Sequence, residues 1–204
     1  MSSRSDSNQI TRDYFDSILL ETRYWDSDLP CTKMELYGET FETPIMTAAL
    51  SHLHEICDNA MAEFGKGAKD AGAVHWVGMG EDDELEQILA TGARTVKIIK
   101  PHREDEVIYH KIRHAAEHGA FAVGMDIDHC FAGNGEYDVV CGLPMHAKTA
   151  SDLENYVKAS SVPFIVKGVL SAKDAEKCVK AGVSGILVSH HHGIMQYAVP
   201  PLMI

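Results

Sequence analysis

Short apolar runs alternate with longer amphipathic stretches along most of the chain, from residue 41 onward. The runs are nearly continuous in apolar and β-branched residues, a pattern typical of parallel strands that are covered on both faces. We predict strands over residues 41–50, 73–78, 95–100, 121–128, 163–170 and 185–190. The stretches between them carry apolar residues at helical spacing and predict helices over residues 57–70, 82–90, 104–118, 150–159 and 172–180.

The N-terminal part of the chain lacks this alternation. Its first seven residues are polar, and we expect them to be disordered. Apolar residues at helical spacing then predict a leading helix between residues 10 and 25. We therefore divide the chain into an N-terminal tail with a leading helix, residues 1–40, and one βα domain, residues 41–204.

Six βα units with short connections are compatible with a doubly wound open sheet or with a (β/α)8 barrel. Neither GxGxxG nor GxxxxGK[ST] follows the first predicted strand, and this weakens the case for the nucleotide-binding open sheets. A complete barrel has eight strands in about 250 residues. We therefore expect an α/β fold of the TIM (β/α)8 barrel type that is incomplete, with about six of eight βα units and a truncated C-terminal end.

Composition narrows the classes of partner. The 18 Lys and Arg residues against 30 Asp and Glu residues give a net charge of −12, which repels the phosphate backbone of nucleic acids. No stretch approaches the roughly 20 apolar residues that a membrane span needs. We expect a small-molecule substrate, with neither nucleic acid nor membrane as a partner.

The cysteines indicate the redox environment. The five cysteines are odd in number and scattered without a CxxC pair, so we expect reduced thiols and a cytoplasmic location. The open strand edges of an incomplete barrel favour association, and a homo-oligomer is therefore a further expectation.

Polar residues near the carboxyl ends of the predicted strands are the candidates for chemistry, because parallel βα folds place their functional groups there. Lys167 stands within the apolar run FIVKGV, where a cation is costly unless it meets an anion or a polarised group. Asp126 and Asp128 in MDIDH point to the same side of a strand. The last predicted strand runs into SHHHG, which contains His191.

A longer stretch gives these residues a family context. VPFIVKGVLSAKDAEKCVKAGVSGILVSHHHG, residues 162–193, resembles the FMN-dependent α-hydroxy acid dehydrogenase and oxidase family, which includes glycolate oxidase and lactate oxidase. The resemblance extends more weakly to PIMTAAL and AVGMDID and so covers residues 41–204. It implies an FMN cofactor and an oxidoreductase that transfers hydride from a hydroxylated substrate to the flavin.

The resemblance also implies roles for particular residues. His191 matches the catalytic base that takes the substrate hydroxyl proton, and Asp128 matches the aspartate that orients this base. Lys167 matches the lysine beside the flavin N1 atom. The remaining matches to flavin-contacting positions are Ala48, Ala49, Leu50 and Asp126. No metal is expected at this site.

Three positions depart from the family pattern. Asn134 in GNGEYD and Ile194 stand where the family has arginines for the substrate carboxylate, and His192 stands where it has glycine. Neither an amide nor an isoleucine replaces a bidentate arginine. The substrate is therefore expected to differ from a standard 2-hydroxy acid.

Two alternatives stay open. One is a degenerate flavin-binding barrel without turnover, which the missing arginines favour. The other is a metal-dependent TIM-barrel hydrolase, in which the His-x-His pair of His52 and His54 would bind zinc through neutral imidazoles.

Overall fold

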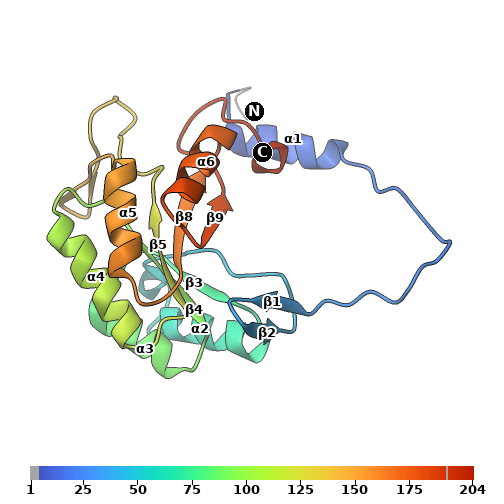
Figure 1. The fold of residues 1–204 in the computed structure, drawn as a ribbon, viewed down its shortest axis with the longest axis horizontal. Helices are drawn as coiled ribbons and strands as arrows, with labels where there is room; N and C mark the ends of the chain where they lie inside the picture. The colour runs from blue at the N-terminus through green and yellow to red at the C-terminus, as the bar shows by residue number, and fades with distance from the viewer. Residues whose placement is uncertain (1–4, 192) are drawn as a thin grey trace.

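The computed structural model describes residues 5–191 and 193–204. A parallel sheet lies at its centre, with helices along its outer side (Figure 1). The helices are α1 (Ser7–Ser17), η1 (Leu53–Glu55), α2 (Ala60–Asp70), α3 (Asp82–Ala90), α4 (Asp105–Glu117), α5 (Ala150–Ala159), α6 (Ala172–Lys180) and η2 (Pro201–Met203). The strands are β1 (Met34–Leu36), β2 (Glu39–Phe41), β3 (His75–Val77), β4 (Thr95–Ile99), β5 (Ala122–Asp126), β6 (Val139–Val140), β7 (Leu143–Pro144), β8 (Phe164–Val169) and β9 (Gly185–Val188).

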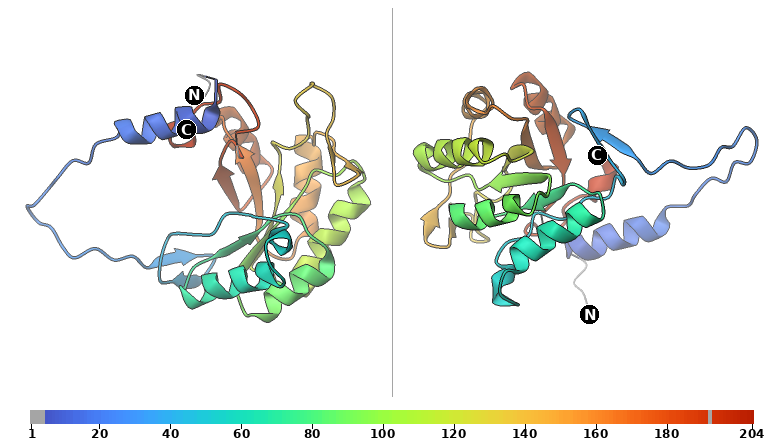
Figure 2. Two further views of the ribbon diagram at one scale, coloured as in Figure 1. Left: turned by 180° about the vertical axis from the view of Figure 1, so that it is seen from behind. Right: turned by 90° about the horizontal axis from the view of Figure 1, so that it is seen from below.

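The order of strands in the central sheet decides between the two architectures. It is β3-β4-β5-β8-β9, and every neighbouring pair is parallel. A doubly wound sheet reverses its order at a switch point, whereas a barrel adds each new strand on the same side of the previous one. The described strands follow the chain without reversal, and the sheet curves (Figure 2). The prediction of an incomplete (β/α)8 barrel is confirmed.

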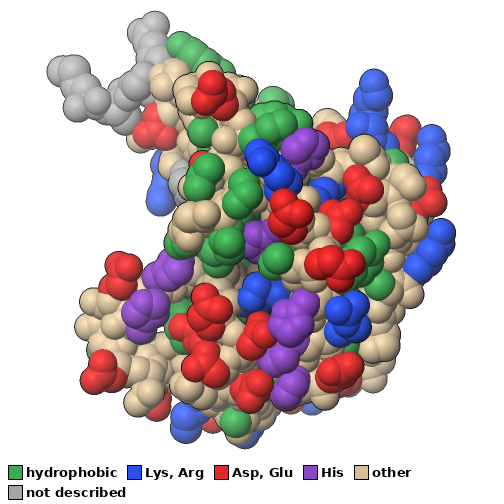
Figure 3. Space-filling model, turned by 90° about the vertical axis from the view of Figure 1, so that its left-hand side faces the viewer, with side chains coloured by type: hydrophobic (Ala, Val, Ile, Leu, Met, Phe, Trp, Pro, Cys, Tyr) green, Lys and Arg blue, Asp and Glu red, His purple; other side chains and the backbone are tan. Residues whose placement is uncertain are grey.

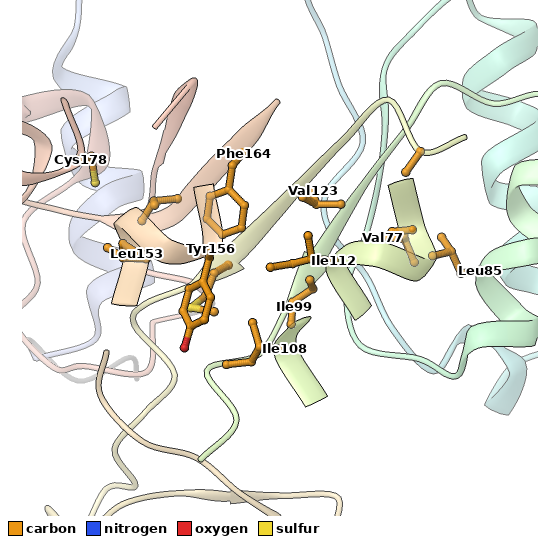
Figure 4. Close-up of a cluster of buried hydrophobic side chains, with 14 of the residues drawn as sticks. Val77, Leu85, Ile99, Ile108, Ile112, Val123, Leu153, Tyr156, Phe164 and Cys178 are labelled. Carbon is orange, nitrogen blue, oxygen red and sulfur yellow. The ribbon is translucent and has the colours of Figure 1, made fainter. Parts of the chain in front are cut away.

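Alternate residues of the strands face two separate cores. Val123 and Val166 point toward the helices, where they join Ile108, Ile112 and Tyr156 in one buried cluster (Figure 4). On the inner face of the sheet a second cluster is formed by Phe41, Val74, Trp76, Val96, Ile98, Phe121, Ala122 and Ile165. Full burial of each large apolar side chain contributes about 1.5–3 kcal/mol, so the two clusters hold the sheet curved and its strand ends in place.

The prediction of a first strand over residues 41–50 is wrong. Phe41 ends β2, which pairs antiparallel with β1, and only Leu50 of this stretch makes a parallel bridge to the sheet, with Val77. Pro44 has no N–H to give to a ladder. Further along, the Thr47 hydroxyl accepts the Trp76 N–H at 2.8 Å, in place of a backbone carbonyl. The segment therefore follows the edge of β3 without becoming a strand.

The N-terminal part also differs from its prediction. Helix α1 begins after Asp6, whose carboxylate accepts the Asn8 N–H at 2.9 Å, and it ends before the extended residue Ile18. Residues 1–4 of the predicted disordered tail lie outside the described residues, but Ser5 and Ser7 are buried. The Ser7 hydroxyl donates to the Met195 carbonyl, so this end of the chain packs on the C-terminal loop. None of the helices in the described part of the chain has the length and apolar character that crossing a bilayer requires.

Candidate active site

Charged side chains from neighbouring strands converge at the carboxyl edge of the sheet. Asp126 ends β5 and lies in register with Lys167 of β8. Lys100 follows β4, and all three side chains point to the inner face of the sheet, because they continue the alternation of the inner apolar residues. The two lysines and the aspartate are each buried.

Asp126 holds both ammonium groups. Its Oδ2 accepts from Lys100 Nζ at 2.7 Å and its Oδ1 accepts from Lys167 Nζ at 2.6 Å. Burial alone would raise the pKa of Asp126, but the two lysines outweigh it and hold the pKa below its ordinary value. The group therefore contains one carboxylate and two ammoniums, and its net charge is positive at the inner edge of the sheet.

His191 lies beside this group, in the turn that follows β9. Its backbone has a φ of 57°, a left-handed conformation that histidine adopts more readily than most residues with a side chain. Its Nδ1 lies 3.0 Å from Lys167 Nζ and 3.1 Å from Asp128 Oδ1. Asp128 lies two residues beyond the end of β5 and therefore connects the histidine to the segment that follows Asp126.

One ring nitrogen cannot accept a hydrogen bond from Lys167 and donate one to Asp128 at the same time. An ionised carboxylate only accepts, so Asp128 pairs with Nδ1 only when Nδ1 is protonated, whereas Lys167 has Asp126 as an acceptor in either tautomer. The contacts therefore favour a proton on Nδ1 of His191 that is donated to Asp128. In that tautomer Nε2 carries the lone pair and is the basic nitrogen.

Gly168 explains how Asp128 approaches so closely. Its φ is +91°, and a Cβ at this position would lie 2.6 Å from Asp128 Oδ2 and 2.7 Å from Asp128 Cβ. The strand pairing of β8 with β9 also shifts register between Lys167 and Val169. The glycine thus lets β8 present Lys167 while leaving room for the carboxylate next to it.

A cavity of about 680 Å³ opens beside Lys167 and His191. Five of the seven predicted site residues line it: Ala48, Ala49, Leu50, Lys167 and His191. The other two do not line it: Asp126 contacts Lys167, and Asp128 contacts His191. The structure thus brings all seven residues together at one place.

Sequence reasoning missed several neighbours of this cavity. Lys100 carried a usable signal, because it ends the apolar run TVKIIK as Lys167 interrupts FIVKGV. Trp76, Leu187 and Ser189 line the cavity but give no comparable signal. His129 packs edge-on against His191, with ring centroids 5.2 Å apart, and only the fold reveals this contact.

The departures from the family pattern fall in two loops. Asn134 is exposed, and its amide nitrogen donates to Glu136 Oε2 at 3.2 Å. Ile194 is half-buried in the loop after β9, and neither residue lines the cavity. His192 lies outside the described residues.

The arrangement does not favour a metal ion at this edge. Asp126, Asp128 and His191 offer ligand atoms within 4.8 Å of one another, but the two lysines bound to Asp126 would repel a divalent cation. His52 and His54 lie with ring centroids 5.8 Å apart. Among the described residues, neither belongs to a group of three potential metal ligands.

Comparison with known proteins gives a consistent family match. The family model described as FMN-dependent dehydrogenase matches residues 2–151 and 145–204. An L-lactate oxidase from Roseobacter sp. (strain GAI101) is 40% identical over 67 residues, which are 33% of this chain and 18% of that protein. The human 2-hydroxyacid oxidase 2 is 24% identical over 219 residues, which cover 91% of this chain and 62% of that protein.

Solved structures show the same fold. Mandelate oxidase with 3,3-difluoro-2-hydroxy-3-phenylpropionic acid superposes with a TM-score of 0.86 at 22% identity, covering 99% of this chain and 65% of that one. The 4-hydroxymandelate oxidase of Amycolatopsis orientalis is 21% identical over 195 residues, 79% of this chain and 55% of that protein. The chain thus spans 48–62% of the length of the curated relatives that it matches over 195 residues or more.

Proposed function

This chain belongs to the family of FMN-dependent dehydrogenases, and from this premise we propose that it serves in the oxidation of a hydroxylated small molecule at its CH–OH group, with FMN as the cofactor. The observation that carries the proposal is the chain of contacts from Asp128 through His191 and Lys167 to Asp126, at the wall of one cavity.

The residues around the cavity suit the cofactor. Ala48, Ala49 and Leu50 contribute an apolar part of the cavity lining. Lys167, which also lines the cavity, provides a cation, fixed by Asp126, for the electron-rich edge of an aromatic ring. When bound, FMN would accept the hydride that leaves the substrate carbon.

His191 would act as the general base. A neutral imidazole with its proton on Nδ1 offers Nε2 to the substrate hydroxyl, and its ordinary pKa of about 6.5 suits proton transfer near neutral pH. Asp128 would hold this tautomer and stabilise the imidazolium that forms. Asp126 would act through Lys167, because it contacts that lysine directly.

The substrate class follows from two positions of the sequence. Neither Asn134 nor Ile194 offers a guanidinium at the positions where the family binds the substrate carboxylate. We therefore propose a hydroxylated substrate other than a standard 2-hydroxy acid. The same two positions support a second candidate, a flavin-binding barrel without turnover.

Absorbance spectroscopy separates the two candidates. The chain is titrated with FMN, and the yellow complex is then mixed anaerobically with a panel of hydroxylated compounds that includes 2-hydroxy acids, their amides and their esters. Bleaching of the flavin band by a compound that lacks a carboxylate supports the proposal. Colour without bleaching supports the binder, and the absence of FMN binding contradicts both.

Three further proposals concern the location of the protein, its oligomeric state and its division into domains. We place it in the cytoplasm, as the scattered cysteines favour reduced thiols. We also propose that it forms a homo-oligomer through an open strand edge, and that residues 1–40 are an N-terminal tail with a leading helix that precedes the βα domain of residues 41–204; this boundary falls within β2.

A further inference from the structure

Three histidines occupy one face of α4 and its C-cap position, on the outer side of the sheet from the site above. His110, His114 and His118 follow one another at four-residue spacing, which places them on the same side of a helix. Figure 3 shows a column of histidine side chains flanked by acidic ones on the face that carries α3 and α4. The acidic partners come from α3, so the column lies along the seam between two helices.

Two of these histidines share one carboxylate. His114 Nε2 lies 3.0 Å and His118 Nε2 lies 3.6 Å from Glu86 Oε1. All three side chains offer ligand atoms within 4.8 Å of one another. Bonds of about 2.0–2.1 Å in a tetrahedral site put neighbouring ligand atoms about 3.3 Å apart. The two distances from Glu86 Oε1, 3.0 and 3.6 Å, lie on either side of that value, so small rotations of the side chains would complete the geometry.

The other ring nitrogens are turned away from Glu86. His118 Nδ1 lies 2.8 Å from the His114 carbonyl oxygen, which can only accept, so Nδ1 carries the proton and Nε2 carries the lone pair. His114 Nδ1 is buried and faces Asp82 Oδ1 at 3.9 Å. Metal-binding histidines commonly direct their second nitrogen at a carbonyl or carboxylate in this way.

We propose that Glu86, His114 and His118 bind a divalent late first-row transition ion, of the class of Zn²⁺ and Ni²⁺, that bridges α3 and α4. Two neutral imidazoles and one carboxylate are a donor set that these ions prefer. Glu86 and His118 are 50% and 42% exposed, so water would complete the coordination. The site lies apart from the cavity, and it does not depend on the proposed oxidation.

Calorimetric titration with Ni²⁺ tests the site. Nickel is the better probe because thiolates favour zinc, and the chain exposes Cys31, Cys57 and Cys141. The unchanged chain is compared with His118→Ala and Glu86→Gln, two substitutions at exposed positions that leave the core intact. His110→Ala is the matched control, because its Nε2 contacts Asp82 at 2.6 Å on the same helix face but outside the three ligands.

We expect one Ni²⁺ per chain at micromolar affinity, and a thermal unfolding midpoint that rises with added Ni²⁺ because the ion binds only the folded helix pair. His118→Ala and Glu86→Gln should each weaken binding about tenfold or more, whereas His110→Ala should bind like the unchanged chain. Circular dichroism of each variant serves as the control for folding. The proposal is overturned if the unchanged chain takes up no Ni²⁺ in this range, or if all four proteins bind it equally.

Discussion

Asp126 is buried between Lys100 and Lys167 and accepts a hydrogen bond from each. Such a group is costly to disturb, since removing one partner leaves the others buried and unpaired. Sequence patterns located Lys167 and Asp126, because a charge within an apolar run stands out. They did not predict the contact with Lys100, because it joins residues 26 positions apart on different strands.

Asp126→Asn is predicted to lower the free energy of unfolding by about 3 kcal/mol, because two buried ammoniums lose the counter-charge that they share. Urea unfolding measures this. Asp70→Asn is the control: Asp70 contacts Lys66 on the surface, and breaking such a pair should cause no measurable change. Equal stability of the two variants would show that the buried group is not held by its charges.

Gly168→Ala is predicted to lower the stability by more than backbone strain alone would, and to slow flavin reduction. At a φ of +91° a side chain costs about 1–2 kcal/mol, and here the new Cβ also meets Asp128. Gly119→Ala is the matched control, with a φ of +87° and no atom within 4 Å of the added Cβ. Both variants should lose stability, but only Gly168→Ala should also slow flavin reduction, by moving Asp128 away from His191. Equal reduction rates in the two variants would remove Asp128 from the mechanism.

At the scale of elements, the helices were the most predictable part. The predicted helices over residues 82–90, 150–159 and 172–180 coincide with α3, α5 and α6, because each has an amphipathic pattern over several turns. The two hairpins escaped prediction, since strands of two or three residues are too short to show a period. The failure at residues 41–50 came from a hydroxyl, on Thr47, that takes the place of a backbone acceptor.

Two strand-end histidines should make the fold sensitive to acid. His75 in β3 and His102 after β4 are buried, and burial lowers the pKa of each to about 4. The unfolded chain has a histidine pKa of about 6.5 and therefore binds more protons between pH 6.5 and 4. Stability must then fall as the pH is lowered through this window, by about 2 kcal/mol per histidine between pH 7 and pH 5.

Urea unfolding at pH 7, 6 and 5 measures this loss. His75→Gln should be less stable at pH 7, because it disturbs the contact with Thr47, but its loss between pH 7 and 5 should be about half as large. Unfolding free energies that stay constant from pH 7 to 5 in the unchanged chain would contradict the buried neutral state of both histidines.

At the scale of the whole molecule, the curved sheet has one edge that the rest of the described chain leaves open. The segment around Thr47 covers the outer side of β3, whereas β9 at the other edge pairs only with β8. The succession of βα units, together with the absence of nucleotide-binding motifs, predicted the barrel type correctly. The packing of α1 on the C-terminal loop could not be predicted, because it joins residues nearly the whole chain apart.

Ile186→Lys is predicted to weaken self-association, because a lysine on an edge strand opposes pairing with a second sheet. Ile186 lies in β9 and is 41% exposed. Val179→Lys on α6 adds the same charge at an exposed apolar position away from the edge, and it should leave association unchanged. Sedimentation velocity over a range of concentrations distinguishes the variants, and equal behaviour of both would exclude the β9 edge as the interface.

The most direct test of the whole account is the rate of anaerobic flavin reduction in His191→Ala, with His190→Ala as the control. His190 is the adjacent histidine and contacts Thr11 at 2.8 Å, outside the cavity. We predict that both variants bind FMN as the unchanged chain does. The flavin in His191→Ala should be reduced about 10²–10⁴-fold more slowly than in the unchanged chain, whereas the rate in His190→Ala should be unchanged. Flavin reduction at an unchanged rate in His191→Ala would contradict the assignment of His191 as the base.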